Sequence, residues 1–313
     1  MQPIRITGRG VYLPKLVHTN ETLPSLERAP TPEQLARLGV RTRHWAGPDE
    51  GVAEMGALAA ERALARAGVR ASEIDLLILA NWTQRSYIPE FAPKLQQLLG
   101  ATRAFAFDLS GACAGFVNGL GILHHFLQNP RYERALLVAS ETLSQRAKPG
   151  SRATLVYGDA AAAWVVERGV GPGSEIIDYE LVTDGAHHGD MGVDANGHVE
   201  THVPQVELNA LAAQSFTKAC RVLLERNRLR IADVDFIVPH SGTEGIQATF
   251  IKTLEVSPEK VLSNFRDVGN VSSAAIPVSL EHYIESGQIK PGDLILSPTA
   301  GAGWYYAALL YRV

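Results

Sequence analysis

The chain has 313 residues, of which 46% are hydrophobic and 20% charged, and its formal net charge is -4 with a pI ≈ 6.2. These values are typical of a globular protein with a substantial core; they exclude a disordered chain and lack the basic excess of a nucleic-acid-binding protein. No apolar run reaches the roughly 18 residues of a membrane span, and two cysteines make no disulfide framework, so a cytoplasmic protein is expected.

The first predicted elements alternate helices with strands. Residues 66–80 read as the end of a helix, a short loop and a buried strand. A helix is expected at 91–99 and a strand at 105–109. A turn of small residues at 110–115 then leads into an amphipathic helix that begins at Phe116.

The second half of the chain repeats this order. Residues 226–240 match residues 66–80 without a gap, 160 positions later. A helix at 247–254, a strand at 261–264 and a second turn of small residues at 269–275 follow, again before an amphipathic helix. The agreement indicates an internal duplication.

The duplication predicts two α/β halves, residues 1–170 and 171–313, related by a pseudo-twofold axis and sharing a site between them. Alternating strands and helices favour mainly parallel sheets covered on both faces. Residues 183–205, rich in glycine, histidine and aspartate, are expected to form a loop that links the halves. Further strands are expected at 135–139, 161–166, 176–182, 293–296 and 305–312.

Three polar residues fall on loops that the duplication brings together. Cys113 lies in the first small-residue turn, at a helix N-terminus whose positive dipole favours a thiolate. His240 follows a central strand, where ligands bind in open α/β sheets. Asn270 lies in the second turn. Alone, each has a structural reading: a buried small residue, a hydrogen-bonded histidine and a turn asparagine. Together they predict a catalytic site.

Three motifs carry a family resemblance: Asp108-Leu-Ser-Gly-Ala-Cys-Ala-Gly-Phe116, Val238-Pro-His240 and Gly269-Asn-Val-Ser-Ser-Ala-Ala-Ile-Pro277. They resemble the nucleophile, histidine and asparagine motifs of β-ketoacyl-acyl-carrier-protein synthase III enzymes, which belong to the thiolase superfamily. The likeness extends over nearly the whole chain. It implies the thiolase fold, with two duplicated α/β halves layered αβαβα.

The resemblance also implies an acyltransferase that performs a decarboxylative Claisen condensation. Cys113 would take an acyl group from a thioester, with the backbone N–H groups of Cys113 and Ala302 as the oxyanion hole. His240 and Asn270 would then stabilise the enolate formed from a malonyl-type thioester. The expected substrates are acyl-coenzyme A and acyl-carrier-protein thioesters, with acyl carrier protein as a partner. No metal, redox cofactor, nucleic acid or membrane is implied.

Substrate-binding residues are carried over from the family in the same way. Tyr87 matches an aromatic residue that closes the acyl pocket of the partner subunit, which implies a homodimer. Arg152 and Arg37 match contacts to coenzyme A, although both also read as solvated surface charges. Gln34 and Gly245 depart from the family pattern at substrate positions. An altered donor or acceptor is therefore expected, and a specialised-metabolite pathway is as plausible as fatty-acid initiation.

Three other functions remain open from the sequence. Acyl transfer to an oxygen, nitrogen or sulfur acceptor would need no enolate stabilisation, so the presence of Asn270 argues against it. An inactive partner subunit should have lost one of the three central residues. A metal site could be built from the histidines and aspartates at 187–202, where His198 and His202 have helical spacing, but the glycines there favour a loop.

Overall fold

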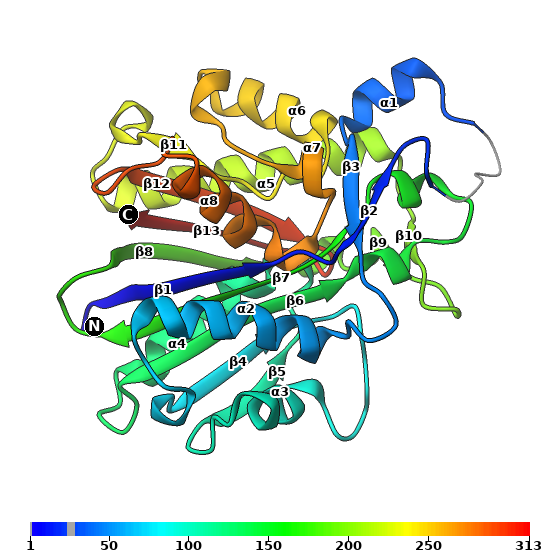
Figure 1. Cartoon of the computed structure of the whole chain (residues 1–313). Coiled ribbons are helices and arrows are strands. Elements are labelled where there is room, and N and C mark those ends of the chain that lie inside the picture. The colour runs from blue at the N-terminus through cyan, green and yellow to red at the C-terminus, as the bar shows by residue number, and fades with distance from the viewer. Residues whose placement is uncertain (1, 24–28) are drawn as a thin grey trace.

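One nine-stranded sheet runs through the part of the chain that the computed structural model describes, residues 2–23 and 29–313 (Figure 1). Its order is β11-β12-β13-β8-β1-β7-β6-β4-β5. The strands are β1 (Ile4–Tyr12), β4 (Leu76–Ala80), β5 (Phe105–Leu109), β6 (Arg134–Thr142), β7 (Asp159–Arg168), β8 (Ser174–Thr183), β11 (Phe236–Ile237), β12 (Leu294–Gly301) and β13 (Tyr305–Arg312). The expected junction at 170/171 lies in the turn between β7 and β8; a division into two domains there stays a prediction.

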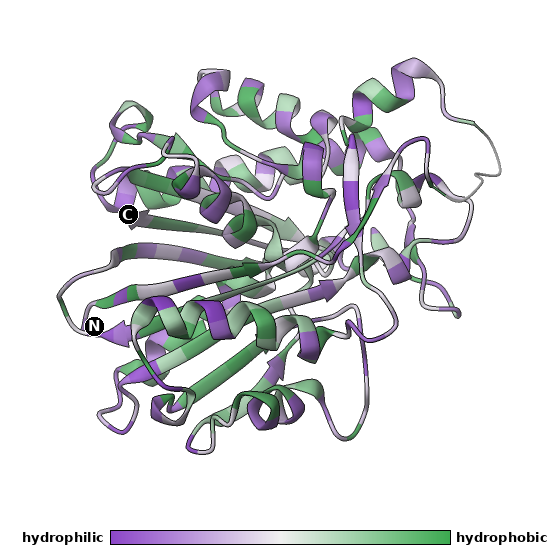
Figure 2. Cartoon of the chain, in the orientation of Figure 1, coloured by the Kyte–Doolittle hydropathy of each residue, from purple (hydrophilic) through white to green (hydrophobic). Residues whose placement is uncertain are grey.

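Helices cover this sheet on both faces, as the alternation in the sequence predicts. They are α1 (Pro32–Leu38), α2 (Val52–Ala67), α3 (Phe91–Leu99), α4 (Gly115–Leu127), α5 (Gln205–Arg226), α6 (Glu244–Leu254), α7 (Phe265–Val268) and α8 (Ala275–Glu285). Figure 2 shows hydrophobic residues concentrated along the inner strands, with hydrophilic residues on the outer helices.

The buried residues form three cores, because successive residues of a strand face opposite sides of the sheet. Leu137 of β6 and Leu309 of β13 pack with α4 and α8 in a central core. Their neighbours point the other way: Leu136 packs under α2 and α3, and Leu310 packs under α5 and α6. The α4–α8 pair therefore lies between two sheet portions that are each covered outside by further helices, which gives the expected αβαβα layers.

The predicted duplication is visible in the hydrogen bonds. The Asp75 N–H donates to the Arg134 carbonyl at 2.9 Å, and the Asp235 N–H donates to the Leu294 carbonyl at 2.9 Å. The carboxylate of Asp75 accepts from the Arg134 N–H, and that of Asp235 from the Leu294 N–H. Both pairs keep the 160-residue offset, so each half begins its central strands in the same way.

The prediction of mainly parallel sheets is wrong. β4 pairs in parallel with β5 and β6, and β11 with β12, but the pairs β6–β7, β7–β1, β1–β8, β8–β13 and β13–β12 are antiparallel. The reason lies in two connections. β6 returns to β7, and β12 to β13, without an intervening α-helix, and a parallel neighbour needs such a crossover.

Two local predictions also change. Residues 183–205 contain the hairpin β9 (Met191–Val193) and β10 (Val199–Thr201) instead of an unstructured loop. The strand expected at 261–264 reduces to a single bridge between Ile237 and Val261. A separate ribbon pairs β2 (Leu16–Thr19) with β3 (Thr42–Trp45). None of the helices in the described residues has the length and apolar character to span a bilayer.

Candidate active site

Cys113 lies in a sharp turn between β5 and α4. The 3₁₀ turn Ala112–Ala114 runs directly into α4, so the thiol is at the N-terminus of a 13-residue helix. Gly111 permits the tight path, because a Cβ there would stand 2.9 Å from the Asn118 side chain. The Thr299 hydroxyl of β12 donates to the Cys113 carbonyl at 3.0 Å, which fixes the turn against the other half of the protein.

Asn270 is held in the equivalent turn of the second half. Its backbone N–H donates to the Val156 carbonyl at 2.7 Å, and its carbonyl accepts from the Gly158 N–H at 2.9 Å. Its side-chain Oδ1 accepts from the Ser272 N–H at 2.9 Å. The Nδ2 group therefore points to the other side, where a Cβ on Gly242 would be only 2.9 Å away.

The Cys113 and Asn270 turns meet in the structure. The hydroxyl of Ser272 lies 3.4 Å from the Cys113 Sγ, so the two turns are in direct contact. His240 is 6% exposed. Its backbone N–H donates to the Pro298 carbonyl at 3.0 Å, and Pro298 directly precedes Thr299, whose hydroxyl holds the Cys113 carbonyl. The sulfur of Cys113 is thus in contact with the Asn270 turn, and the backbones of Cys113 and His240 are both hydrogen-bonded to β12; that the imidazole and the carboxamide act on one substrate with the sulfur stays a prediction.

Burial sets the charge state of the Cys113 thiol and of the His240 imidazole. The Cys113 residue is partly exposed, yet protein surrounds the thiol closely enough to raise its pKa to about 12. A hydrogen bond from Ser272 opposes this shift. Burial lowers the pKa of His240 to about 4, so the imidazole is neutral at physiological pH. The resting site therefore holds a thiol and a neutral imidazole: burial outweighs the helix dipole expected to favour a thiolate.

A buried carboxyl group, Glu141 of β6, connects the loops from behind. It is 0% exposed and accepts hydrogen bonds from the Ser273 hydroxyl at 2.6 Å and the Thr83 hydroxyl at 2.8 Å. The backbone N–H groups of Trp82 and Thr83 also point at it, both at 3.3 Å. Burial raises the pKa of Glu141 to about 7. Sequence reasoning missed this residue; its one signal was an acidic side chain next to the predicted strand 135–139.

Ala302 lies in the tight turn between β12 and β13, directly after a residue that contacts the nucleophile's backbone. That preceding residue, Gly301, packs so closely that a Cβ on it would stand 2.7 Å from the Cys113 backbone nitrogen. The role of the Cys113 and Ala302 N–H groups as oxyanion donors stays a prediction. Gly301 is a further residue that sequence reasoning did not single out.

The three substrate-binding candidates lie at the surface. Tyr87, with a relative exposure of 106%, is in the loop between β4 and α3, while Arg37 is in the last turn of α1 and Arg152 begins a 3₁₀ turn before β7. No hydrogen bond or ion pair among the described residues joins them to Cys113 or His240. Their roles stay predictions.

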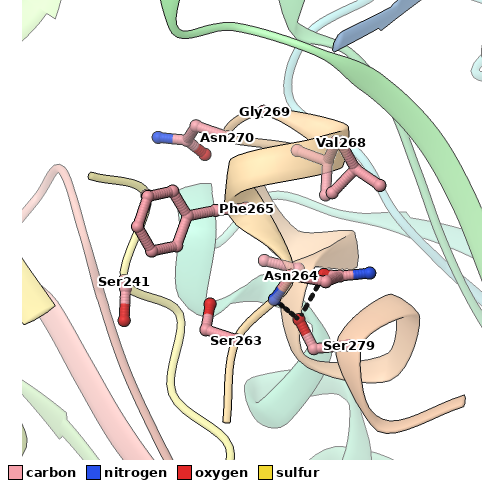
Figure 3. Close-up of a pocket in the computed structure, with 11 residues that line it drawn as sticks. Ser241, Ser263, Asn264, Phe265, Val268, Gly269, Asn270 and Ser279 are labelled. Atoms are coloured by element: carbon pink, nitrogen blue, oxygen red, sulfur yellow. Dashed lines mark hydrogen bonds between the residues drawn. The ribbon is translucent and has the colours of Figure 1, made fainter. Parts of the chain in front are cut away.

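The surface has two hollows near these loops, one at the Asn270 turn and one between the helices α2 and α8. A narrow crevice, too tight for a water molecule, is lined by Ser241, Ser263, Phe265 and Asn270, and Figure 3 shows the Asn264–Ser279 hydrogen bonds on one of its walls. A wider groove runs between α2 and α8. It is lined by Arg62, Arg66, Glu281 and Glu285, with Arg66 paired to both glutamates. Neither is lined by Cys113.

The histidines and acids at 187–202 pair off separately. His187 contacts Asp190 at 2.8 Å, His198 contacts Asp194 at 3.4 Å, and His202 contacts Glu200 at 3.0 Å. Within residues 2–23 and 29–313, no three histidine, cysteine or acidic side chains converge as metal ligands would.

Comparisons with known proteins agree with this geometry. Family models described as 3-oxoacyl-[acyl-carrier-protein] synthase III and as its C-terminal part match residues 107–185 and 224–313. The β-ketoacyl-[acyl-carrier-protein] synthase III of Symbiobacterium thermophilum is 34% identical over 100% of this chain and 98% of its own.

Solved structures give the same result. The 3-oxoacyl-[acyl-carrier-protein] synthase III of Aquifex aeolicus superposes with a TM-score of 0.92 and 32% identity, over 99% of this chain and 100% of that one. The priming β-ketosynthase of the R1128 polyketide pathway gives a TM-score of 0.88 and 30% identity, over 99% and 96%. The αβαβα arrangement described above is the thiolase fold of these enzymes.

Proposed function

Because this chain belongs to the 3-oxoacyl-[acyl-carrier-protein] synthase III family, whose members condense an acyl thioester with a malonyl thioester and release CO₂, we propose that Cys113, His240 and Asn270 carry out that reaction here. The observation that carries the assignment is the anchoring of Asn270. Its Oδ1 accepts the N–H of Ser272, whose own hydroxyl lies 3.4 Å from the Cys113 sulfur. The carboxamide N–H groups are thereby free for a substrate beside the thiol.

In the first half-reaction the Cys113 sulfur attacks the carbonyl carbon of an acyl thioester. The thiol proton passes to the departing thiolate, and the acyl group stays on the sulfur. The backbone N–H groups of Cys113 and Ala302 stabilise the oxyanion, and each such donor is typically worth about a hundredfold or more in rate. The α4 dipole acts in the same direction at the sulfur.

In the second half-reaction a malonyl thioester replaces the departed thiol. Neutral His240 and the Asn270 amide both donate hydrogen bonds to its thioester carbonyl. Loss of CO₂ leaves an enolate whose charge these two donors stabilise. Its carbon then bonds to the acyl carbon, the carbon–sulfur bond breaks, and the electron pair returns to Cys113, whose thiolate takes a proton from solvent to restore the resting thiol. A neutral imidazole suits this role, because it can donate one hydrogen bond without a net charge.

The test separates the two half-reactions. Purified enzyme is incubated with acetyl-, butyryl-, octanoyl- or dodecanoyl-coenzyme A, and the acyl adduct is measured by intact-protein mass spectrometry. Cys113→Ala should abolish the adduct, whereas Cys220→Ala, which removes the other and fully buried thiol, should keep it. Adducts that persist in Cys113→Ala would refute the nucleophile.

Release of labelled CO₂ from malonyl thioester reports the second half-reaction. Asn270→Ala should retain the acyl adduct but lose CO₂ release by about a hundredfold or more. An enzyme that transfers the acyl group without releasing CO₂ would instead be the non-condensing acyltransferase.

Because Gln34 and Gly245 depart from the family pattern, the acyl-coenzyme A series also tests whether the preferred donor has changed. Comparing coenzyme A with carrier-protein thioesters tests the carrier, and Arg37→Ala and Arg152→Ala should raise KM for coenzyme A donors alone.

The enzyme is proposed to act in the cytoplasm as a homodimer joined through β5. This strand ends the sheet, and its Phe105 is 52% exposed beside the aromatic rings of Phe107 and Phe126. An apolar edge strand is a template for pairing with another chain, and a second copy would supply an identical strand. Tyr87, in the loop after the neighbouring strand β4, would then reach the partner's site.

Light scattering on a sizing column tests the interface. Phe105→Glu should shift the protein from dimer to monomer. Val206→Glu, at an exposed apolar position on α5, which covers the end of the sheet opposite β5, is the matched control and should stay dimeric. A monomeric wild-type protein, or a Phe105→Glu variant that remains dimeric, would refute this interface.

A further inference from the structure

The Ser272 side chain contacts the Cys113 sulfur but has no role in the two half-reactions described so far. Ser272 is 1% exposed, and its hydroxyl oxygen lies 3.4 Å from the Cys113 Sγ. It belongs to the Asn270 turn, so it approaches the thiol from the opposite half of the protein. A hydroxyl buried against a nucleophile can either accept the thiol hydrogen or donate its own, and the two arrangements have opposite effects on a thiolate.

Trp82 occupies one acceptor lone pair of the Ser272 oxygen and leaves the serine hydrogen available to the sulfur. Its indole Nε1 lies 2.7 Å from the Ser272 Oγ, and an indole nitrogen can only donate. The serine oxygen therefore accepts from Trp82, and its single hydrogen is left for another partner. Among the residues that the structure describes, the side-chain atom that this hydroxyl can donate to is Cys113 Sγ. The chain of hydrogen bonds thus runs from Trp82 through Ser272 to the sulfur.

The backbone also commits Ser272 to this place. Its φ is 52°, in the left-handed region that non-glycine residues rarely adopt, and Ala112 beside Cys113 has the equivalent φ of 46°. The Ser272 N–H is the donor that anchors Asn270. One residue therefore holds the enolate-stabilising amide with its backbone and contacts the nucleophile with its side chain.

One ionisable group near the thiol opposes thiolate formation. Glu141 of β6, when ionised, repels a negative sulfur, whereas burial raises the pKa of Tyr157 and keeps its phenol neutral. Ser272 is the side-chain donor that favours the charged form. A hydrogen bond to a charged acceptor is stronger than one to a neutral acceptor, so its contribution grows as the thiolate develops.

We propose that Ser272 is a further catalytic residue, whose hydroxyl stabilises the Cys113 thiolate, and that Trp82 is the positioning residue that directs this hydroxyl. The proposal rests on Cys113 being the nucleophile. Ser272 keeps its own proton throughout. It donates to the sulfur as the thiol proton leaves in the first half-reaction, and again as the carbon–sulfur bond breaks and the electron pair returns in the second.

The experiment compares two rates in the same variants. Acylation of Cys113 is followed by rapid quench and intact-protein mass spectrometry, with the member of the acyl-coenzyme A series that labels the wild type best. CO₂ release is measured on pre-acylated enzyme. Ser272→Ala and Ser272→Gly both keep the backbone N–H that anchors Asn270. Each should acylate about tenfold more slowly, the loss expected for one hydrogen bond to a charged group, with CO₂ release within twofold of wild type.

The melting temperature of Ser272→Gly and the acylation rates of two further variants, Trp82→Phe and Ser273→Ala, distinguish a chemical effect from a folding defect. Ser272→Gly suits the positive φ, so its melting temperature should equal or exceed that of Ser272→Ala. Trp82→Phe keeps the ring but removes the donor, and should slow acylation by a smaller factor. Ser273→Ala is the matched control, since that neighbouring hydroxyl donates to Glu141 and not to the sulfur, and it should acylate within twofold of wild type.

Acylation of both Ser272 variants at the wild-type rate would overturn the proposal, and so would equal losses in acylation and CO₂ release, which a purely structural role would produce. A wild-type enzyme that takes up no acyl group on Cys113 would refute the nucleophile itself, which is a different result.

Discussion

Replacing Glu141 with glutamine is expected to remove a fall in stability that the wild-type protein shows between pH 5 and pH 8. Glu141 is completely buried, and its folded-state pKa of about 7 lies above its ordinary value of 4.5. An acid whose pKa is raised on folding binds its proton more tightly in the native state. Its stabilising effect is therefore fully present below pH 4.5 and is lost as the pH rises through 7.

The size of the effect follows from the difference between these two pKa values. At about 1.4 kcal/mol per unit the whole effect is about 3 kcal/mol, of which between about 2 and 3 kcal/mol falls between pH 5 and pH 8. Glutamine has nearly the same shape, and its oxygen can accept from Thr83 while Ser273 turns to accept from its amide. The variant should thus fold but lack this pH dependence.

The assay is urea unfolding followed by tryptophan fluorescence at fixed protein concentration and at several pH values from 5 to 8. Asp159, whose pKa is raised by burial to about 6, titrates in both proteins, so its effect cancels in the difference. Glu61→Gln, at an exposed position on α2, controls for the loss of a carboxylate. Parallel pH profiles for wild type and Glu141→Gln would refute the reasoning, because the four donors would then outweigh burial.

Three further predictions follow from close contacts and burial. Gly301→Ala should slow acylation of Cys113 at least about tenfold in the rapid-quench assay, because its Cβ would stand 2.7 Å from the Cys113 nitrogen; an unchanged rate would contradict the proposed oxyanion hole. Gly158→Ala should lower the melting temperature by several degrees or more, since its Cβ would come within 2.1 Å of a carbonyl oxygen beneath the Asn270 turn, whereas Gly189→Ala, with open space around it, should melt as wild type. Iodoacetamide should alkylate Cys113 in the native protein slowly, because its raised pKa keeps it a thiol, and should reach Cys220 only after denaturation; two additions without denaturant would show that α5 opens.

Local patterns in the sequence were enough to place the helix 91–99 and the strand 105–109, because their ends are marked by local signals. Gly100 ends the helix in the left-handed conformation at φ 67°, and Gly111 opens the turn after the strand. The duplication extended this success to the second half. Each aspartate before a central strand makes the same hydrogen bonds in both halves, so one correctly placed turn located its counterpart 160 residues away.

The features that local patterns missed depend on contacts between distant segments. Glu141 meets Ser273 across 132 positions of sequence, and Trp82 meets Ser272 across 190. A glutamate near a strand or a tryptophan in a loop carries no sign of its partner. Strand direction failed for a related reason: the antiparallel return from β12 to β13 is set by the three-residue turn after Gly301, which carries no helical pattern.

The duplication also explains why one of two equivalent turns became the nucleophile. At the 160-residue offset Cys113 corresponds to Ser273, and Gly301 of β12 corresponds to Glu141 of β6. Beside the Asn270 turn, the Glu141 carboxyl group accepts a hydrogen bond from the Ser273 hydroxyl at 2.6 Å. Beside the Cys113 turn, the equivalent strand position is Gly301, which has no side chain, and the Cys113 backbone nitrogen packs directly on it. The missing side chain lets the backbone of the Cys113 turn pack against β12, while the Glu141 carboxyl group stands between β6 and the equivalent turn and ties it to the Trp82 loop. A symmetric scaffold thus supports an asymmetric site through the identity of two residues behind the turns as well as through Cys113 itself.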